Sequence, residues 1–68
     1  MIKTIYTIPA PYTINVTIEV YGDPDNAWYE WRIIDGKHVE KDTGDGQGCQ
    51  YGQAEIALRD ALIFASSV

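Results

Sequence analysis

The sequence has little of what metal sites, disulfides and most catalytic centres require. It contains one cysteine, Cys49, and one histidine, His38, so neither an intramolecular disulfide nor a zinc site of the usual ligand number can form. A single cysteine also favours a reducing compartment. Pro9 and Pro11 interrupt the apolar residues near the N-terminus, so neither a signal peptide nor a membrane span is predicted. We therefore expect a soluble cytoplasmic protein without metal or cofactor.

Basic residues are also scarce, because five Lys and Arg stand against ten Asp and Glu and give a net charge of −5. This excess of negative charge disfavours nucleic acid and anionic membranes as partners and favours a basic protein surface. The same excess keeps a small protein soluble, and both interpretations stay open. A chain of 68 residues buries only about 60% of its unfolded surface. One domain over residues 1–68, with one sheet and one helix, is therefore predicted.

Signals for β-structure are strong, and the clearest local one is Asp35-Gly36 within AWYEWRIIDGKHVEKDT. Asp-Gly between two extended segments is typical of a β-hairpin. A two-residue loop would surround Val39 with charges, whereas a three-residue loop with Gly36 in the left-handed conformation gathers the apolar residues, and we predict the latter. One face then carries Tyr29, Trp31, Ile33 and Val39. The other face carries Trp28, Glu30, Arg32, Ile34, His38, Glu40 and Asp42.

Three further segments complete the predicted fold. Residues Tyr12–Tyr21 alternate between apolar and polar side chains and predict a strand, and the turn residues Gly22–Asn26 join it to the hairpin in antiparallel fashion. Tyr51–Ser66 has small and apolar residues at three- and four-residue spacing and predicts a helix on the apolar face. The expected fold class is α+β, a three-stranded antiparallel meander with one C-terminal helix (β-β-β-α), or a four-stranded one if Met1–Ile8 pairs at the edge. The buried face of the first long strand would carry Ile14, Val16, Ile18 and Val20.

No motif in the sequence predicts a catalytic or metal site. The glycine-rich stretch 44–48 lacks the Lys and Ser/Thr of a P-loop and does not open a βαβ unit. Asp42 and Asp45 resemble half of a calcium loop, but glycines occupy the other ligand positions. Cys49 and His38 have no orienting third group and no oxyanion hole. We therefore expect that the protein is not an enzyme.

Acidic residues gather on the outer face and rim of the predicted sheet. Carboxylates on neighbouring strands lie about 5 Å apart and repel one another, a cost that stability alone does not require. Docking against Lys and Arg would offset this cost, with Trp28 and Tyr21 as aromatic anchors. The alternative is a solvated face that Arg32, Lys37 and His38 interrupt. The candidate partner-binding residues are Glu19, Asp23, Asp25, Trp28, Glu30, Asp35, Glu40, Asp42 and Asp45.

The stretches YTINVTIEVYGDPDNAWYEWRIIDG and YGQAEIALRDALIFASS cover most of the chain and resemble the small anti-CRISPR proteins of phages and mobile elements. The similarity is greatest to the inhibitors of type I (Cascade) systems and lies in size, acidity and β-β-β-α order. It implies a stoichiometric inhibitor in the host cytoplasm that binds a basic DNA-handling surface and imitates the phosphate backbone. The alternative is an acidic adaptor of phage or prophage origin that binds another host protein by its sheet edge or its Trp28 side. A monomer is expected rather than a homodimer.

Overall fold

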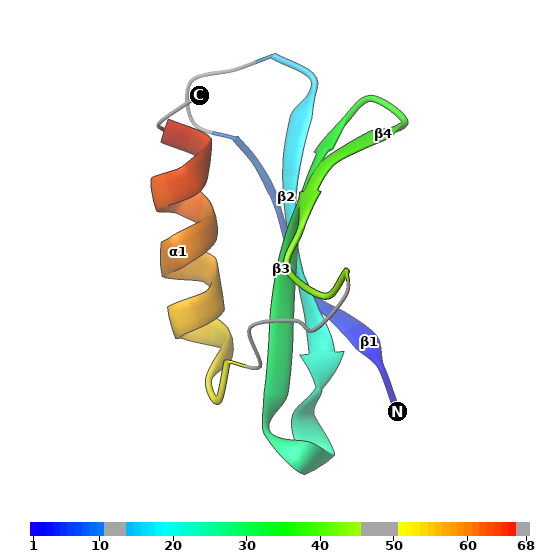
Figure 1. The fold of residues 1–68 in the computed structure, drawn as a ribbon, viewed down its shortest axis with the longest axis vertical. Coiled ribbons are helices and arrows are strands. Elements are labelled where there is room, and N and C mark those ends of the chain that lie inside the picture. Colours follow the sequence, from blue (N-terminus) through cyan, green and yellow to red (C-terminus); the bar gives the residue numbers. More distant parts are fainter. Residues whose placement is uncertain (11–13, 46–50, 67–68) are drawn as a thin grey trace.

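A four-stranded antiparallel sheet with one helix on one face forms the fold (Figure 1). The structure is a computed structural model that describes residues 1–10, 14–45 and 51–66. The sheet has the order β1-β2-β3-β4, so the N-terminal segment is indeed a fourth strand at the edge. The predicted α+β class and the C-terminal helix are confirmed. The elements are β1 (Lys3–Pro9), β2 (Val16–Asp23), the short 3-10 helix η1 (Pro24–Asn26), β3 (Trp28–Asp35), β4 (His38–Asp42) and α1 (Ala54–Ser66).

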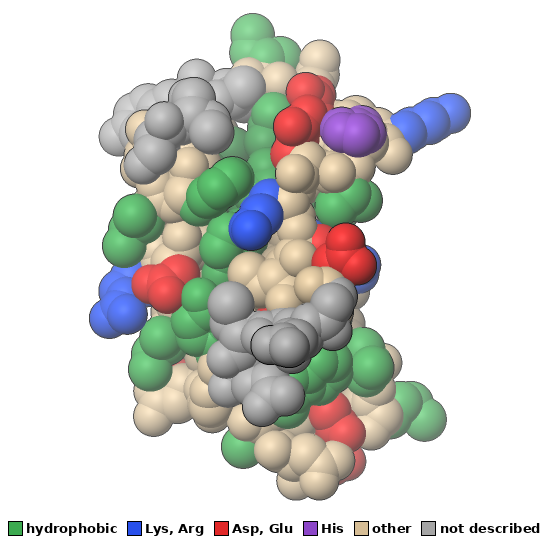
Figure 2. Space-filling model, viewed as in Figure 1, with side chains coloured by type: hydrophobic (Ala, Val, Ile, Leu, Met, Phe, Trp, Pro, Cys, Tyr) green, Lys and Arg blue, Asp and Glu red, His purple; other side chains and the backbone are tan. Residues whose placement is uncertain are grey.

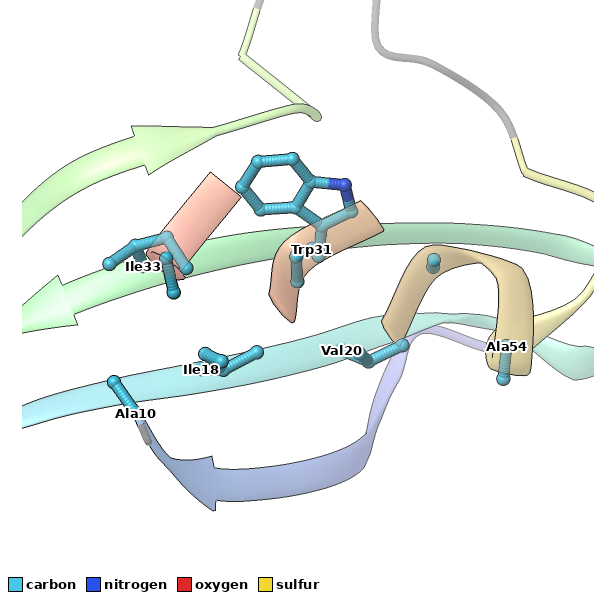
Figure 3. Close-up of a cluster of buried hydrophobic side chains, with 9 residues drawn as sticks. Ala10, Ile18, Val20, Trp31, Ile33 and Ala54 are labelled. Atoms are coloured by element: carbon cyan, nitrogen blue, oxygen red, sulfur yellow. The ribbon is translucent and has the colours of Figure 1, made fainter. Parts of the chain in front are cut away.

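The core lies between α1 and the two central strands. Ile18 pairs with Ile33 and Val20 with Trp31, so these four side chains share the face toward the helix. Figure 3 shows them gathered within one buried cluster. The helix contributes only small residues to the buried set, and small residues let its backbone lie close to the sheet. The buried helix residues are Ala54, Ala57, Ala61 and Ala65.

The turn between β3 and β4 is shorter than predicted. Asp35 pairs with His38, which leaves a two-residue loop of Gly36 and Lys37. Gly36 has a φ of +62°, so its predicted left-handed conformation is confirmed. The predicted three-residue loop is wrong.

A β-bulge on β4 then changes which residues share a face. Ile34 pairs with Val39 and Ile33 pairs with Lys41, so Glu40 is the extra residue on β4. Val39 therefore lies on the outer face with 46% of its surface exposed, and its predicted place in the core is wrong. Glu40 turns toward the helix side of the sheet, contrary to its predicted place on the outer face.

The first long strand begins later than predicted. In place of Tyr12–Tyr21, the structure has β2 from Val16, and residues 12 and 13 lie outside the described residues. Asn15 has a φ of +67°, a conformation that Asn tolerates in turns. This turn leaves Ile14 86% exposed, so its predicted burial is wrong.

The helix also begins later than the predicted Tyr51. Tyr51 forms an isolated antiparallel bridge with Tyr29, in which each backbone N–H donates to the other residue's carbonyl, at 3.0 and 2.9 Å. This bridge pairs the chain just before α1 with the start of β3 and so fixes the position of the chain at the beginning of α1. The helix therefore starts at Ala54 rather than at Tyr51.

Gly22 marks a close approach between β2 and β3. A Cβ added here would lie 2.1 Å from the carbonyl oxygen of Trp28 and 2.8 Å from the Cα of Tyr29. Because backbone atoms cannot move aside freely, we expect Gly22→Ala to lower the free energy of unfolding by about 2–3 kcal/mol. Urea denaturation measures this loss. In the control Gly52→Ala, where an added Cβ meets nothing within 4 Å, the change should stay within about 0.5 kcal/mol, and equal losses would contradict the close approach.

Candidate functional site

An ionic cluster crosses the outer face of the sheet, which is the face opposite α1. Arg32 on β3 forms ion pairs with Glu19 on β2 and with Asp42 on β4, the latter at 3.7 Å. Glu19 also accepts a hydrogen bond of 2.6 Å from Thr4 on β1. The Arg32 guanidinium lies 4.3 Å from the centroid of the Tyr21 ring, and the Tyr21 hydroxyl donates to Asp42. This outer-face cluster links all four strands and pairs two carboxylates that were predicted to be free for docking with the one positive charge of Arg32.

The cluster also changes the proton affinity of its members. Burial, followed by the hydrogen bond to Asp42, raises the pKa of the Tyr21 hydroxyl, which therefore stays a donor. For Glu19, burial by itself would raise the pKa, but the hydrogen bonds from Thr4 and Arg32 and the charge of Arg32 together lower it. The Glu19 carboxylate is therefore more stable as an anion in the folded protein than in the unfolded chain.

This lowered pKa predicts an acid-dependent loss of stability. Because the folded-state pKa of Glu19 lies below its unfolded value of about 4.3, its contribution is present above that pH and is lost as pH falls through the folded-state pKa. We expect Glu19→Gln to cost about 1 kcal/mol or less near neutral pH, and this cost to shrink as the pH falls from neutral to below the unfolded-state pKa. Urea denaturation of both proteins across this range measures it. A cost that stays constant with pH would contradict the role of Glu19, and Asp25→Asn is the control.

Glu30 lies beneath the outer face and is 0% exposed. Its carboxyl group accepts a hydrogen bond of 2.8 Å from Trp28 Nε1 and one of 2.7 Å from the Thr43 hydroxyl. The Thr43 backbone N–H in turn donates to the carbonyl of Trp31, and its hydroxyl accepts from the Trp31 N–H, both at 3.0 Å. Glu30 therefore fixes the end of β4 against β3. Its predicted place on an exposed docking surface is wrong, and Trp28 is half-buried rather than free.

Asp23 and Asp25 lie at the end of the sheet where η1 connects β2 to β3. Asp23 accepts a hydrogen bond of 2.7 Å from Asn26 Nδ2 and lies 3.1 Å from the amino group of Met1. The hydrogen bond from Asn26, and then that from the N-terminus, lower the pKa of Asp23. Asp25 is exposed on η1. Asp23 therefore caps η1, whereas the carboxylate of Asp25 is exposed to solvent.

Asp35 and Glu40 lie at the opposite end of the sheet, beside a groove between α1 and the strands. The groove has a volume of about 250 Å³. Asp35 and Glu40 line it and are both exposed, so their carboxylates lie at its open side. Figure 2 shows acidic side chains next to hydrophobic atoms at this end, near the histidine. The other described residues that line the groove are Ala10, Val16, Ile33, Phe64 and Ala65.

The structure thus separates the predicted docking residues into several places. Glu19 and Asp42 belong to the outer-face cluster, and Asp45 follows β4 and is exposed. Sequence reasoning missed Thr43 and treated Arg32 as a mere interruption. The role of Arg32 could have been inferred from its cross-strand position opposite Glu19. That position follows from the sequence only if Gly22 and Asp23 are assigned to the strand rather than to the turn.

The described part of the chain contains neither a cluster of metal ligands nor a membrane-spanning helix. Within it, no three His, Cys, Asp or Glu side chains lie close enough together to hold a metal ion. His38 Nε2 lies 3.9 Å from Glu40 Oε1, while Cys49 and the glycines at 46 and 48 lie outside the described residues. None of the helices in residues 1–10, 14–45 and 51–66 is long and apolar enough to cross a membrane.

In comparisons with known proteins, the chain matches no protein-family model, no curated protein and no solved structure. The functional interpretation therefore depends on the chain's own residues and on the resemblance described above. Those residues offer two features for binding, the exposed carboxylates and the groove beside Asp35 and Glu40.

Proposed function

We propose that the chain is a small non-enzymatic protein that binds a basic surface of another protein. The observation that carries this proposal is that only some of the predicted docking carboxylates are paired or buried. Glu19 and Asp42 share the positive charge of Arg32 within the outer-face cluster, whereas Asp35, Glu40 and Asp45 stay exposed around β4 and form what we call the acidic end. With a net charge of −5, this exposed set attracts Lys and Arg on a partner.

The partner in this proposal is a DNA-handling surface of a type I (Cascade) CRISPR effector complex. The resemblance to small anti-CRISPR proteins supports it, and a surface that binds phosphates is rich in Lys and Arg. The protein would act in the host cytoplasm as a monomer, without a cofactor, and would keep target DNA from binding. The exposed carboxylates of the acidic end would contact the partner. A continuous acidic sheet face would not, because Glu30 is buried.

A gel shift tests this function directly. A purified type I effector complex is bound to its target duplex, and the protein is titrated in at about 50 mM and about 200 mM salt. We expect the shifted band to disappear near one-to-one stoichiometry at low salt and to require more protein at high salt. A band unchanged at both salt concentrations would contradict the proposed function.

The second candidate function is an adaptor that binds another host protein through apolar contacts. The observation that favours it is the exposure of large hydrophobic side chains, Val39 on the outer face at 46% and Ile63 on α1 at 57%. Such binding would hardly depend on salt, because apolar burial is not screened by ions. Capture of a host protein whose binding is lost in Val39→Ser but unaffected by salt would favour this function over the first.

A further inference from the structure

We propose that the groove between the C-terminal half of α1 and the β3–β4 hairpin binds one arginine side chain of the basic partner. This inference rests on the proposed function and names the chemical group of the partner that the acidic end would bind. Its two parts are an apolar wall and a pair of carboxylates at the open side. Both parts lie at one end of the molecule, far along the sheet from the η1 turn (Figure 1).

The apolar wall fits the stem of an arginine. Ala10, Ile33 and Ala65 are buried and Val16 is half-buried, so the described residues of the inner part of the groove offer carbon surface. Long basic side chains bury their methylene stems along such surface while the charged head stays at the edge. A volume of about 250 Å³ accommodates a side chain rather than a helix or a strand.

The open side of the groove fits a guanidinium group. Asp35 and Glu40 present carboxylates there, and an arginine head donates in a planar fork that suits carboxylate oxygens. Phe64 also lines the groove, and guanidinium groups stack on aromatic rings. The Phe64 ring is held by Trp31, with centroids 5.4 Å apart and planes tilted by 45°. The ammonium group of lysine has neither a planar pair of donors for a carboxylate nor a flat face that can stack on Phe64. Lysine should therefore bind this groove less tightly than arginine.

Three basic side chains lie near these carboxylates, Lys37 in the turn and His38 and Lys41 on β4, and must be considered as competitors. His38 lies 3.9 Å from Glu40, with both side chains well exposed. Lys41 pairs with Ile33 and so shares the helix side of the sheet with Glu40. All three side chains are exposed, so the pairs that they form with Asp35 and Glu40 contribute little energy, and an incoming arginine can replace them.

The test is a titration of the full chain, labelled with ¹⁵N, with Nα-acetyl-arginine amide. We expect shifts of the backbone signals of Val16, Ile33, Phe64 and Ala65, with a dissociation constant of about 1–10 mM, as is typical of so small a ligand. Nα-acetyl-lysine amide should bind about three-fold more weakly or worse, and Nα-acetyl-norleucine amide should not shift these signals. Shifts spread over all acidic residues, or equal binding of the three amides, would overturn the proposal.

Two double variants that each remove two negative charges test where on the protein arginine amide binds. Asp35→Asn with Glu40→Gln should weaken arginine amide binding about five-fold, the effect of two exposed ion pairs. Asp25→Asn with Asp45→Asn removes the same charge away from the groove lining and should leave the constant within about two-fold. If the control pair weakens binding as much as the groove pair, the attraction is general and the groove site is refuted.

The same variants separate this inference from the proposed function. If wild-type protein removes the gel shift and the groove pair does so equally well, the groove inference fails and the function stands. If the wild-type protein never removes the gel shift but binds arginine amide in the groove, the Cascade proposal fails and the groove site stands.

Discussion

Replacing Glu30 by lysine should remove most of the protein's stability at room temperature. The side chain is 0% exposed, and its carboxyl group accepts from Trp28 Nε1 and from the Thr43 hydroxyl. A lysine would leave both donors facing a buried positive charge, which costs more than about 4 kcal/mol. The whole stability expected of a 68-residue domain is roughly 3–10 kcal/mol, so most of it would be lost.

Circular dichroism and urea denaturation measure the effect of this substitution, and two variants serve as controls. Glu40→Lys makes the same change of charge at an exposed residue and should stay folded, with a change of stability within about 1 kcal/mol. Glu30→Gln keeps an acceptor oxygen and the side-chain shape, and should cost about 1–3 kcal/mol. Native stability of Glu30→Lys would show that Glu30 does not hold β4 as described.

Trp31→Ala should be nearly as damaging, with a loss of about 4 kcal/mol in the free energy of unfolding. Trp31 is 5% exposed on a central strand and packs against Phe64 of α1. Its Nε1 also donates a hydrogen bond of 3.2 Å to the Tyr51 hydroxyl, which connects the core to the start of the helix. Removal of the indole would leave a cavity where sheet, helix and the bridge at Tyr51 meet.

Thermal or urea unfolding of Trp31→Ala tests this prediction, with Trp28→Ala as the matched control on the other face. Trp28 is only half-buried, so its loss should cost less than that of Trp31, mainly through the lost hydrogen bond from Trp28 Nε1 to the Glu30 carboxyl group. If the two variants lost the same stability, the position of Trp31 at the centre of the core would be contradicted.

The parts of the fold that sequence could predict are those in which one local pattern decides. Ile18 and Val20 alternate with polar residues in a period of two, and the alanines of α1 recur at helical spacing, so the burial of these residues was predicted correctly. The turn at Gly36 was also found from Asp35-Gly36, since Gly there takes a positive φ.

The register of β4 could not be predicted, because a buried polar group decides it. The prediction placed Val39 opposite Trp31 on the assumption that apolar residues gather on one face. In the structure Thr43 takes the place next to Trp31, where it hydrogen-bonds to the Trp31 backbone and to the buried Glu30. The bulge that permits this position of Thr43 turns Glu40 to the helix side. No local sequence pattern predicts the bulge.

The candidate site was predicted only in part for the same reason. Composition indicated an acidic protein, and the exposed Asp35 and Glu40 were among the predicted residues. Composition cannot distinguish them from Glu19 and Asp42, which form ion pairs with Arg32 across the strands. The groove beside Asp35 and Glu40 also depends on Phe64 and Ala65, far away in sequence, which only the packing of α1 brings there.

Competition between the protein and target DNA is the measurement that tests the central claim most directly. In a gel shift of a type I effector complex, the amount of protein that removes half of the shifted band is determined at two concentrations of target duplex. The assay is run at about 200 mM salt, where more than one equivalent of protein is needed, and with both DNA concentrations well above the dissociation constant of the DNA. If the acidic end occupies the DNA-handling surface, a ten-fold increase in DNA should then raise that amount about ten-fold, as for any competitor of one site. An amount that does not change with DNA, or a band that persists at every protein concentration, would contradict the claim that this protein binds where DNA binds.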